Sequence, residues 1–451
     1  MTETENSKLG MFSTLSIGIG GMVGGGIFAV TGLTIEITRG AAPVAFLISG
    51  IVALLTSYSY LKLTLQFPGE GGTVEYLNRA FGSGILTGAA NILLLMCYIV
   101  LVAIYAYAFG SYGASVFPAD QNNFWQHTLV SGVIIGLCLL NIISTELVIR
   151  SENFFNGVKM VLLALFIVAG LLTPMDWTRL GPENYVSPVG LIAGAMLIFL
   201  NYEGFELIAN ASNDVANPQK TLPVAYLGGI FVVMVIYVLI VGVVVGHMSF
   251  AEVGNASDRA LSVAATRIAG TPGFIAILIA ALLATSSAIN ATFYGTGRLT
   301  YIIAKTGELP TELERSIRGQ HLEGTLISAF LALLVANFVP LEAIATMGSA
   351  GFLLIFLAVN LANVRLAKQT NSHVWLSGLA AFSTAVALIV LCIKVDENPV
   401  NRNHLWILFG MIVASLLIEF CYRNITGRKI HLIRHHKYHH SQPASPDPQA
   451  E

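Results

Sequence analysis

The sequence predicts an all-α integral membrane protein of about twelve helical spans, on the evidence of composition, run length and recurrence. Hydrophobic residues make up 55% of the 451 residues and charged residues 11%, whereas soluble domains carry about 25% charged residues. Charge-free apolar runs such as 225–245 and 374–393 match the roughly 20 residues that cross a hydrocarbon core about 30 Å thick. Because such runs recur along almost the whole chain, we expect one helical bundle in a lipid bilayer.

Polar residues, prolines and glycines interrupt the apolar runs and set the limits of each predicted span. The first six spans are expected at 11–38, 42–67, 84–117, 127–146, 153–173 and 188–212. The second six are expected at 222–247, 271–303, 323–339, 341–366, 374–393 and 404–422.

The distribution of Lys and Arg predicts the orientation, because basic residues resist translocation. A cytoplasmic N-terminus puts most of the basic residues of the connecting segments on the inner side, and an even number of spans returns the C-terminus there. The outer side then holds only Arg39, Arg179, Arg259, Arg267, Lys394 and Arg402. We therefore expect a multi-pass inner-membrane protein with both termini in the cytoplasm.

Several other classes of function lack support in the sequence. The formal net charge of −2 gives no reason to expect a nucleic-acid partner, and no HExxH, GxSxG or P-loop motif points to an enzyme or a cofactor. The four cysteines lie in apolar segments without a CxxC pair and are interpreted as small buried hydrophobic residues. A basic tail touching anionic lipid is favoured over a metal site for the histidines, which are His431, His435, His436, His439 and His440.

Glycines crowd the middle of the first span, where the bilayer midplane should lie. They are Gly18, Gly20, Gly21, Gly24, Gly25 and Gly26. Each costs about 1 kcal/mol against Ala in a helix interior, and bare backbone at membrane depth is tolerated only around a cavity or inside protein. Close helix packing through small residues is the alternative, but three consecutive glycines exceed what packing needs. The run predicts an unwound segment.

The sixth span carries a matching polar interruption in the segment IFLNYEGFELIAN. Its members Asn201, Glu203, Gly204 and Glu206 lie in an otherwise apolar stretch, and a charge at the bilayer centre usually faces a functional interior. Equivalent helices five spans apart run in opposite directions, which is the inverted-repeat arrangement of secondary transporters. Half-helix ends at mid-depth suit a carboxylate and an ammonium, so the predicted guest is a zwitterion.

Four segments resemble the motifs of the amino acid/polyamine/organocation transporter superfamily. GGMVGGGIF at 20–28 resembles G-x-x-[IV]-G-x-G-I-F, and FPGEGGTVEYLNRAFG at 67–82 resembles the segment after span 2. NYEGFELIANASNDVANPQKTLP at 201–223 resembles Y-x-G-F-E followed by N-P-x-[KR]-x-[IL]-P. The segment from Ser287 through Asn290 to GELP at 307–310 resembles S-x-x-N-A and the G-x-L-P end of span 8.

The resemblance implies a leucine-transporter-like fold of five spans plus five inverted, with discontinuous helices 1 and 6 and two peripheral helices. The corresponding parts are a tail at 1–10, repeats at 11–173 and 188–366, helices 11 and 12 at 374–422, and a tail at 423–451. It also implies that an amino acid carboxylate binds N–H groups of Gly24, Gly25 and Gly26. The amino group would bind carbonyls around Met22, Val23, Phe199 and Asn201, beside Glu203 and Gly204.

The chain departs from the family pattern at three places. Leu200 occupies the position of the usual aromatic gate, with Phe199 adjacent, and Lys62 stands where many members have Glu. The acidic pair after span 6 reads Asn213-Asp214. We expect the substrate pocket to include side chains such as Tyr98, Leu200, Asn290 and Met347.

Lys159 resembles a lysine that several family members carry where sodium-coupled relatives bind an ion. Its ammonium would tie carbonyls of span 1 to Ser286 or Ser287 of span 8, and a proton could couple to its pairing and release. The alternative is that Lys159 snorkels to the headgroups. Lys62 similarly could pair with Glu70 or Glu75 or reach the interface.

The favoured function is therefore an amino acid permease, working by proton-coupled symport or exchange. A polyamine or amine carrier is the first alternative, because Glu203 and Glu206 would attract a second positive charge. Glu203 could instead cap backbone N–H groups at the helix break. A non-transporting amino acid sensor with the same fold is the third possibility.

Overall fold

The computed structural model describes residues 9–69, 71–143, 145–310, 313, 322–397 and 402–426. Nearly all of these residues are helical, and the β pairing among them consists of two isolated bridges, Leu9 with Val215 and Arg39 with Tyr185. The histidine-rich segment and the N-terminal residues 1–8 lie outside the described residues.

The helices of the first half follow the predicted spans closely. They are α1 Met11–Met22, α2 Gly26–Thr38, α3 Ala42–Gln66, α4 Gly72–Phe81, α5 Ile85–Ala114, η1 Ala119–Gln121, α6 Asn122–Ile143, α7 Thr145–Leu172, η2 Trp177–Leu180, η3 Pro182–Asn184, α8 Pro188–Leu197, η4 Phe199–Tyr202, α9 Leu207–Asn210 and η5 Ser212–Asp214. Those of the second half are α10 Pro218–Pro223, the π-helical η6 Val224–Gly228, α11 Gly229–His247, α12 Phe250–Asn255, α13 Ala260–Thr306, α14 Leu322–Phe338, α15 Leu341–Arg365, α16 Ala367–Thr370, α17 Val374–Glu397 and α18 Arg402–Thr426.

Nine helices among the described residues are long and apolar enough to cross a membrane, or eleven if each of two bent pairs counts as one span. The bent pairs are α1 with α2 and α8 with the η4–α9 segment, each bent by 46°. At 17 residues α14 is a shorter apolar helix. The all-α membrane fold and the discontinuity of helices 1 and 6 are confirmed, while the total of twelve spans stays a prediction.

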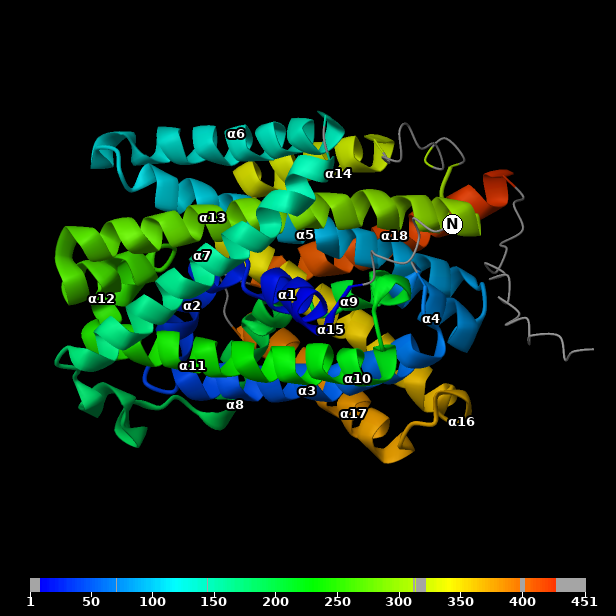
Figure 1. Ribbon diagram of the computed structural model, residues 1–451, viewed down its shortest axis with the longest axis horizontal. Coiled ribbons are helices and arrows are strands. Elements are labelled where there is room, and N and C mark those ends of the chain that lie inside the picture. Colours follow the sequence, from blue (N-terminus) through cyan, green and yellow to red (C-terminus); the bar gives the residue numbers. More distant parts are fainter. Residues whose placement is uncertain are drawn as a thin grey trace, which may run out of the picture.

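The broken helices lie in the middle of the bundle, between long helices that run side by side (Figure 1). Helix α13 packs on α5 and α7, α15 packs on α5 and α17, and α3 packs on α11 and α8. α12 lies at one end of the bundle, and α4, α10 and α16 lie toward the other (Figure 1). The breaks are thus held near the middle of the bundle by helices that extend past them on both sides.

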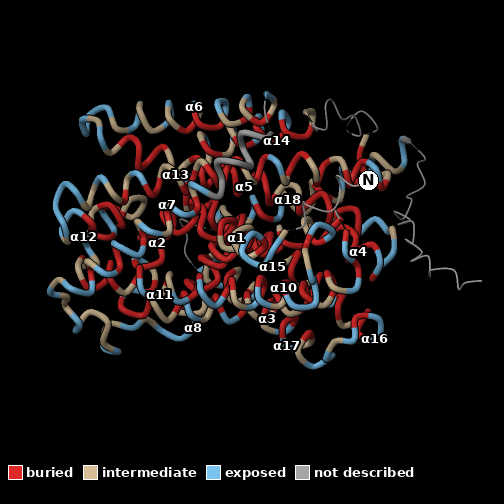
Figure 2. The backbone as a smooth tube through the Cα atoms, in the orientation of Figure 1, coloured by how far each residue is buried: buried red, intermediate tan, exposed pale blue. Residues whose placement is uncertain are grey.

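Burial separates a central set of helices from a lipid-facing set (Figure 2). Buried residues make up 78% of the most apolar window in α5 and α15, but only 22% in α18. Large hydrophobic side chains such as Leu139, Phe382 and Phe409 stay exposed on α6, α17 and α18. In a bilayer this apolar outer surface meets lipid tails, so polar groups are concentrated inside the bundle.

The helical pieces that fall outside the predicted spans include α4, α12, α16 and the first turns of α13. Helix α4 is short and carries Glu75 and Arg79, which form an ion pair at 2.7 Å, so a search for long apolar runs overlooks it. The first turns of α13 are separated from the predicted span by Gly270, whose φ of 62° interrupts the helix. Cys421 is exposed rather than buried, because α18 is at the periphery, which corrects the prediction for that cysteine.

Candidate functional site

The first break lies between α1 and α2 and is made of residues 23–25. Among the described residues, the N–H groups of Gly24 and Gly25 donate no main-chain hydrogen bond, and the first N–H groups of α2 lack a partner within the helix. A Cβ atom on Gly25 would lie 2.8 Å from Thr285 Cγ2, and one on Gly24 2.9 Å from Ala288 Cβ. The predicted unwinding is confirmed, and the glycines also allow the close packing that was its alternative.

The second break covers the segment between α8 and α9, and Gly204 is its closest approach to the first. Gly204 has a φ of 120°, and a Cβ there would lie 2.4 Å from the carbonyl carbon of Gly21. Only a residue without a side chain fits this conformation and this distance. The second break is therefore in direct backbone contact with the last turn of α1, immediately before the first break.

Tyr237 of α11 joins the two breaks through its hydroxyl group. The hydroxyl oxygen lies 2.7 Å from the Met22 carbonyl oxygen and 3.2 Å from that of Asn201, to which it can donate. These are two of the four residues whose carbonyls were predicted to bind a substrate amino group. Nothing in the apolar run around Tyr237 distinguishes it in the sequence, because its partners are carbonyls that only the breaks make available.

Ser349 of α15 makes a similar link within the second break. Its hydroxyl donates to the Leu197 carbonyl at 2.6 Å and accepts from the Leu200 N–H at 3.4 Å. It thereby satisfies backbone groups on both sides of the end of α8. Phe199 packs edge-on against Phe356 with ring centroids 5.8 Å apart, so α15 supports the segment that holds the predicted residues Phe199 and Leu200.

The two acids of the second break have different surroundings. Glu206 accepts from the Gly204 N–H at 2.7 Å and from the Tyr98 hydroxyl at 3.2 Å, so it caps the break and brings the predicted residue Tyr98 to it. Glu203 is 1% exposed, and neither carboxylate oxygen has a hydrogen-bond partner among the described residues. The expectation that Glu203 caps backbone N–H groups is wrong, since the turn at Gly204 presents its N–H to Glu206 instead.

Asn201 is the third polar side chain at this break. It is 1% exposed, and within the described part of the chain both atoms of its side-chain amide lack a hydrogen-bond partner. The amide oxygen lies 2.3 Å from the position that a Cβ on Gly26 would occupy, so the side chain reaches the start of α2. Glu203 and Asn201 thus leave buried polar atoms unpaired where the two breaks meet, which is unusual in a protein interior without a ligand.

Lys159 of α7 is fully buried, with 0% exposure. Its Nζ donates to the Gly20 carbonyl at 3.1 Å, which satisfies a backbone group near the end of α1. Burial contradicts the snorkelling alternative, because the ammonium points into the bundle and not to the headgroups. A cavity of about 400 Å³ lies beside it between α1 and α7, lined partly by Gly20, Asn156 and Lys159.

Other predicted residues lie outside this constellation or at its edge. Asn290 accepts from Asn141 of α6 at 2.6 Å, so its amide oxygen faces α6. Lys62 donates to the Asn371 carbonyl at 3.0 Å near an exposed surface, and Glu75 pairs with Arg79. The pairing of Lys62 with Glu75 is therefore wrong, and Glu70 lies outside the described residues.

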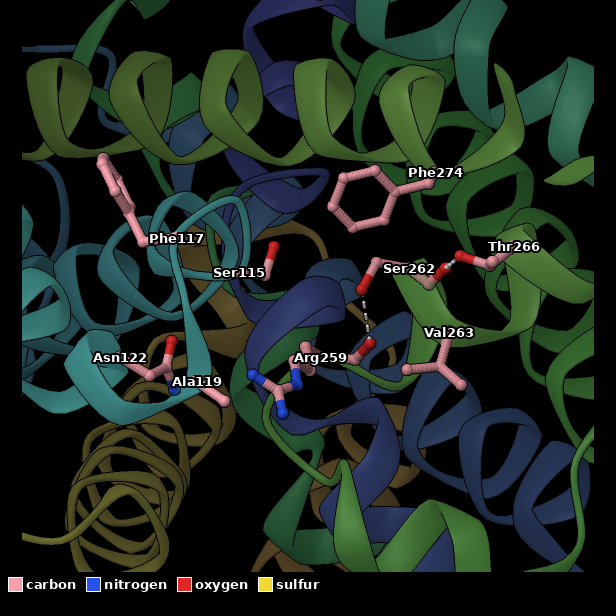
Figure 3. A pocket seen from close by; sticks show the side chains of 9 residues that line it. All are labelled: Ser115, Phe117, Ala119, Asn122, Arg259, Ser262, Val263, Thr266 and Phe274. Atoms are coloured by element: carbon pink, nitrogen blue, oxygen red, sulfur yellow. Dashed lines mark hydrogen bonds between the residues drawn. The ribbon is translucent and has the colours of Figure 1, made fainter. Parts of the chain in front are cut away.

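Two further cavities lie between helices of the bundle. A narrow one of about 10 Å³, too small for an amino acid, lies between the start of α4, the middle of α5, α9 and the second half of α13, and reaches Tyr98 and Glu206. A wider one of about 310 Å³ lies between the end of α5, η1 and the start of α13. Figure 3 shows Arg259 among the residues that line it, with Ser262 Oγ donating to the Arg259 carbonyl at 2.9 Å.

The comparisons with known proteins agree with this architecture. The amino acid permease family matches residues 9–417. The chain is 34% identical to the uncharacterized protein MJ0609 of Methanocaldococcus jannaschii, over 94% of this chain and 98% of that protein. It is 30% identical to the inner membrane transport protein YbaT of Escherichia coli, over 93% and 98%. It is 26% identical to the serine/threonine exchanger SteT of Bacillus subtilis, over 67% and 69%. A chain with these breaks and these relatives is a multi-pass membrane protein that belongs to the amino acid permease family.

Proposed function

We propose that this protein moves amino acids across the inner membrane by alternating access. The observation that carries the proposal is that the second break, at Gly204, contacts Gly21 in the last turn of α1, immediately before the first break. The free N–H groups at Gly24, Gly25 and Gly26 suit the substrate carboxylate. Carbonyls around Met22, Val23, Phe199 and Asn201 suit the amino group once the Tyr237 hydroxyl shares or releases them.

The orientation and the repeat arrangement belong to the same proposal. The distribution of basic residues favours cytoplasmic termini, and YbaT is named as an inner membrane protein. Residues 11–173 and 188–366 would form the two inverted repeats, with 374–422 as the peripheral pair. In this arrangement the substrate site lies where helices 1 and 6 of the two repeats cross.

Uptake by purified protein in liposomes tests the transport function directly. Labelled amino acids are supplied one at a time, with and without imposed proton and sodium gradients. Accumulation of at least one amino acid is expected. Binding without accumulation would support a sensor instead, and a sodium requirement would contradict proton coupling.

Lys159 is proposed to couple a proton to this cycle. The buried ammonium on the Gly20 carbonyl ties α7 to the first break, so its protonation affects how that segment is held. Ser286 and Ser287 of α13 are the proposed partners on the other side. Lys159→Ala should abolish uptake or remove its pH dependence, whereas uptake and pH dependence like those of the wild type would contradict the coupling role.

An amine or polyamine carrier is a second candidate, and the unpaired Glu203 carboxylate is the observation that favours it. Four plant relatives are named cationic amino acid transporters. Competition of labelled amino acid uptake by putrescine separates the two functions, since an amine carrier would be inhibited strongly and a neutral amino acid permease would not.

A further inference from the structure

Glu203 is a buried carboxyl group that forms no ion pair with any described residue. Among the described residues it has no ion pair and no hydrogen-bond partner, although it is 1% exposed. Lys159, the fully buried cation of this region, is bonded to the Gly20 carbonyl. Transferring an ionised carboxylate into such a place is strongly unfavourable unless a cation joins it. Glu203 must therefore carry a proton or face a positively charged guest.

The groups around Glu203 come from its own segment and from two neighbouring helices. Glu206 is the other acid of the break, and it is already held by the Gly204 N–H and the Tyr98 hydroxyl. Two tyrosines of neighbouring helices lie beside this break: the Tyr98 hydroxyl of α5 donates to Glu206, and the Tyr60 ring of α3 packs edge-on against Phe205. The faces of tyrosine rings favour an ammonium or guanidinium group.

The Glu203 carboxyl group is also separate from the backbone carbonyl groups that suit a substrate amino group. Those of Met22 and Asn201 are held by Tyr237 of α11, whereas the Glu203 carboxyl oxygens bond neither to Tyr237 nor to any other described residue. One substrate can thus place its α-amino group at the carbonyls and a second cationic group at Glu203. Asn201, whose side-chain amide atoms have no hydrogen-bond partner among the described residues, lies just before Glu203 in the sequence and can orient the substrate.

We infer that Glu203 is a subsite for the second positive charge of a cationic substrate, and that it holds a proton when that charge is absent. The inference rests on the proposed transport function and deepens it. A lysine-like substrate displaces the proton from the carboxyl group, while a neutral amino acid leaves the proton in place. The occluded site then has the same net charge with either class of substrate.

The proton balance follows from this exchange at one carboxyl group. Binding of the cationic substrate on one side of the membrane breaks the O–H bond of Glu203 and releases the proton to that side. When the substrate leaves on the other side, the carboxylate takes a proton from that side and carries it back. Each cationic substrate moved by this route is accompanied by one proton moving in the opposite direction through Glu203.

Lysine and norleucine form a matched pair for the test, because norleucine has the same chain length without the terminal ammonium. Wild-type protein in detergent and weak buffer is mixed with each ligand, adjusted to the pH of the protein solution, and a pH dye reports the protons released. About one proton per bound lysine and none per bound norleucine is expected. Lysine binding without proton release overturns the inference.

The variant Glu203→Gln tests the same subsite by selectivity. It keeps the shape of the side chain but has no acidic proton, so the ratio of lysine to norleucine affinity should fall about ten- to a hundredfold. Glu36→Gln, an exposed acid on α2, is the matched control and should keep the wild-type ratio. An unchanged ratio in Glu203→Gln overturns the subsite.

The outcomes separate this inference from the proposed function. If the wild-type protein accumulates norleucine in liposomes but neither binds nor moves lysine, transport stands and the Glu203 subsite is wrong. If it accumulates neither class of amino acid, the transport function itself is wrong. Because the proton-release measurement uses the wild-type chain, it decides the question even if Glu203→Gln fails to fold.

Discussion

The two broken helices are both interrupted near the centre of the bundle, but different kinds of residue form the two breaks. Each bends by 46° at the centre of the bundle. The first break consists of glycines whose added Cβ atoms would collide with Thr285, Ala288 and Asn201. The second has one glycine at the contact, and around it Asn201, Glu203 and Glu206 with their polar groups buried.

This difference indicates that the two breaks have different roles. The glycine break offers backbone N–H groups, which any amino acid carboxylate can use whatever its side chain is. The polar break offers side chains, which can distinguish one substrate from another. In a family that moves many small molecules, we expect the first break to hold what substrates share and the second to select among them.

The largest expected effect comes from Gly204→Ala, which attacks the contact between the breaks. The added Cβ would lie 2.4 Å from the Gly21 carbonyl carbon at a φ of 120°, so strain and overpacking should cost at least about 3 kcal/mol. Thermal unfolding in detergent and uptake in liposomes should both show the loss. Gly242→Ala is the control, since no described atom beyond the adjacent backbone of its own helix lies within 4 Å of its added Cβ, and equal behaviour of the two variants would contradict the contact.

A smaller effect is expected when the link between the breaks loses only a hydroxyl group. Tyr237→Phe leaves the ring in place but leaves the Met22 and Asn201 carbonyls without their donor, at a cost of about 1 to 3 kcal/mol. The unfolding temperature should fall, and substrate affinity should change because those carbonyls become free. Tyr294→Phe removes a hydroxyl from a residue that is 44% exposed, and a Tyr237→Phe variant as stable as this control would contradict the link.

Glu308 provides a contrast to Glu203, because it is a buried acid that accepts a hydrogen bond. It follows α13 at the end of the bundle and accepts from Asn91 Nδ2 at 2.8 Å. Burial raises the pKa of Glu308 from 4.5 to about 7, assisted by Glu419 and opposed by the Asn91 hydrogen bond.

The sign of the pH dependence follows from that raised pKa. Between pH 4.5 and about 7 the folded protein binds this proton more tightly than the unfolded chain. The free energy of unfolding should therefore fall as the pH rises through this window, by up to about 3 kcal/mol from this group. Glu308→Gln should remove that part of the slope in unfolding measured at several pH values, and parallel curves for variant and wild type would refute it.

Much of the fold could be predicted from the chain because its causes are local. Apolar runs of the length of the bilayer core give α3, α5 and α15 nearly their observed ends, and the glycine run places the first break correctly. Helix α4 and the first turns of α13 were missed because a short helix with charged residues carries no comparable signal. The sequence motifs also identified the family that the comparisons confirm.

The sequence by itself determined which segments form long apolar helices, where two of them break and which polar groups lie at the breaks. These features depend on composition within a few helical turns. Only the tertiary structure decided the partner of each group. It assigned the Gly204 N–H to Glu206 instead of Glu203, placed the Tyr237 hydroxyl on two carbonyls, paired Asn290 with Asn141 and buried Lys159 on Gly20. The physical reason is that a hydrogen bond requires contact within about 3 Å, and such contacts between distant segments depend on how whole helices pack.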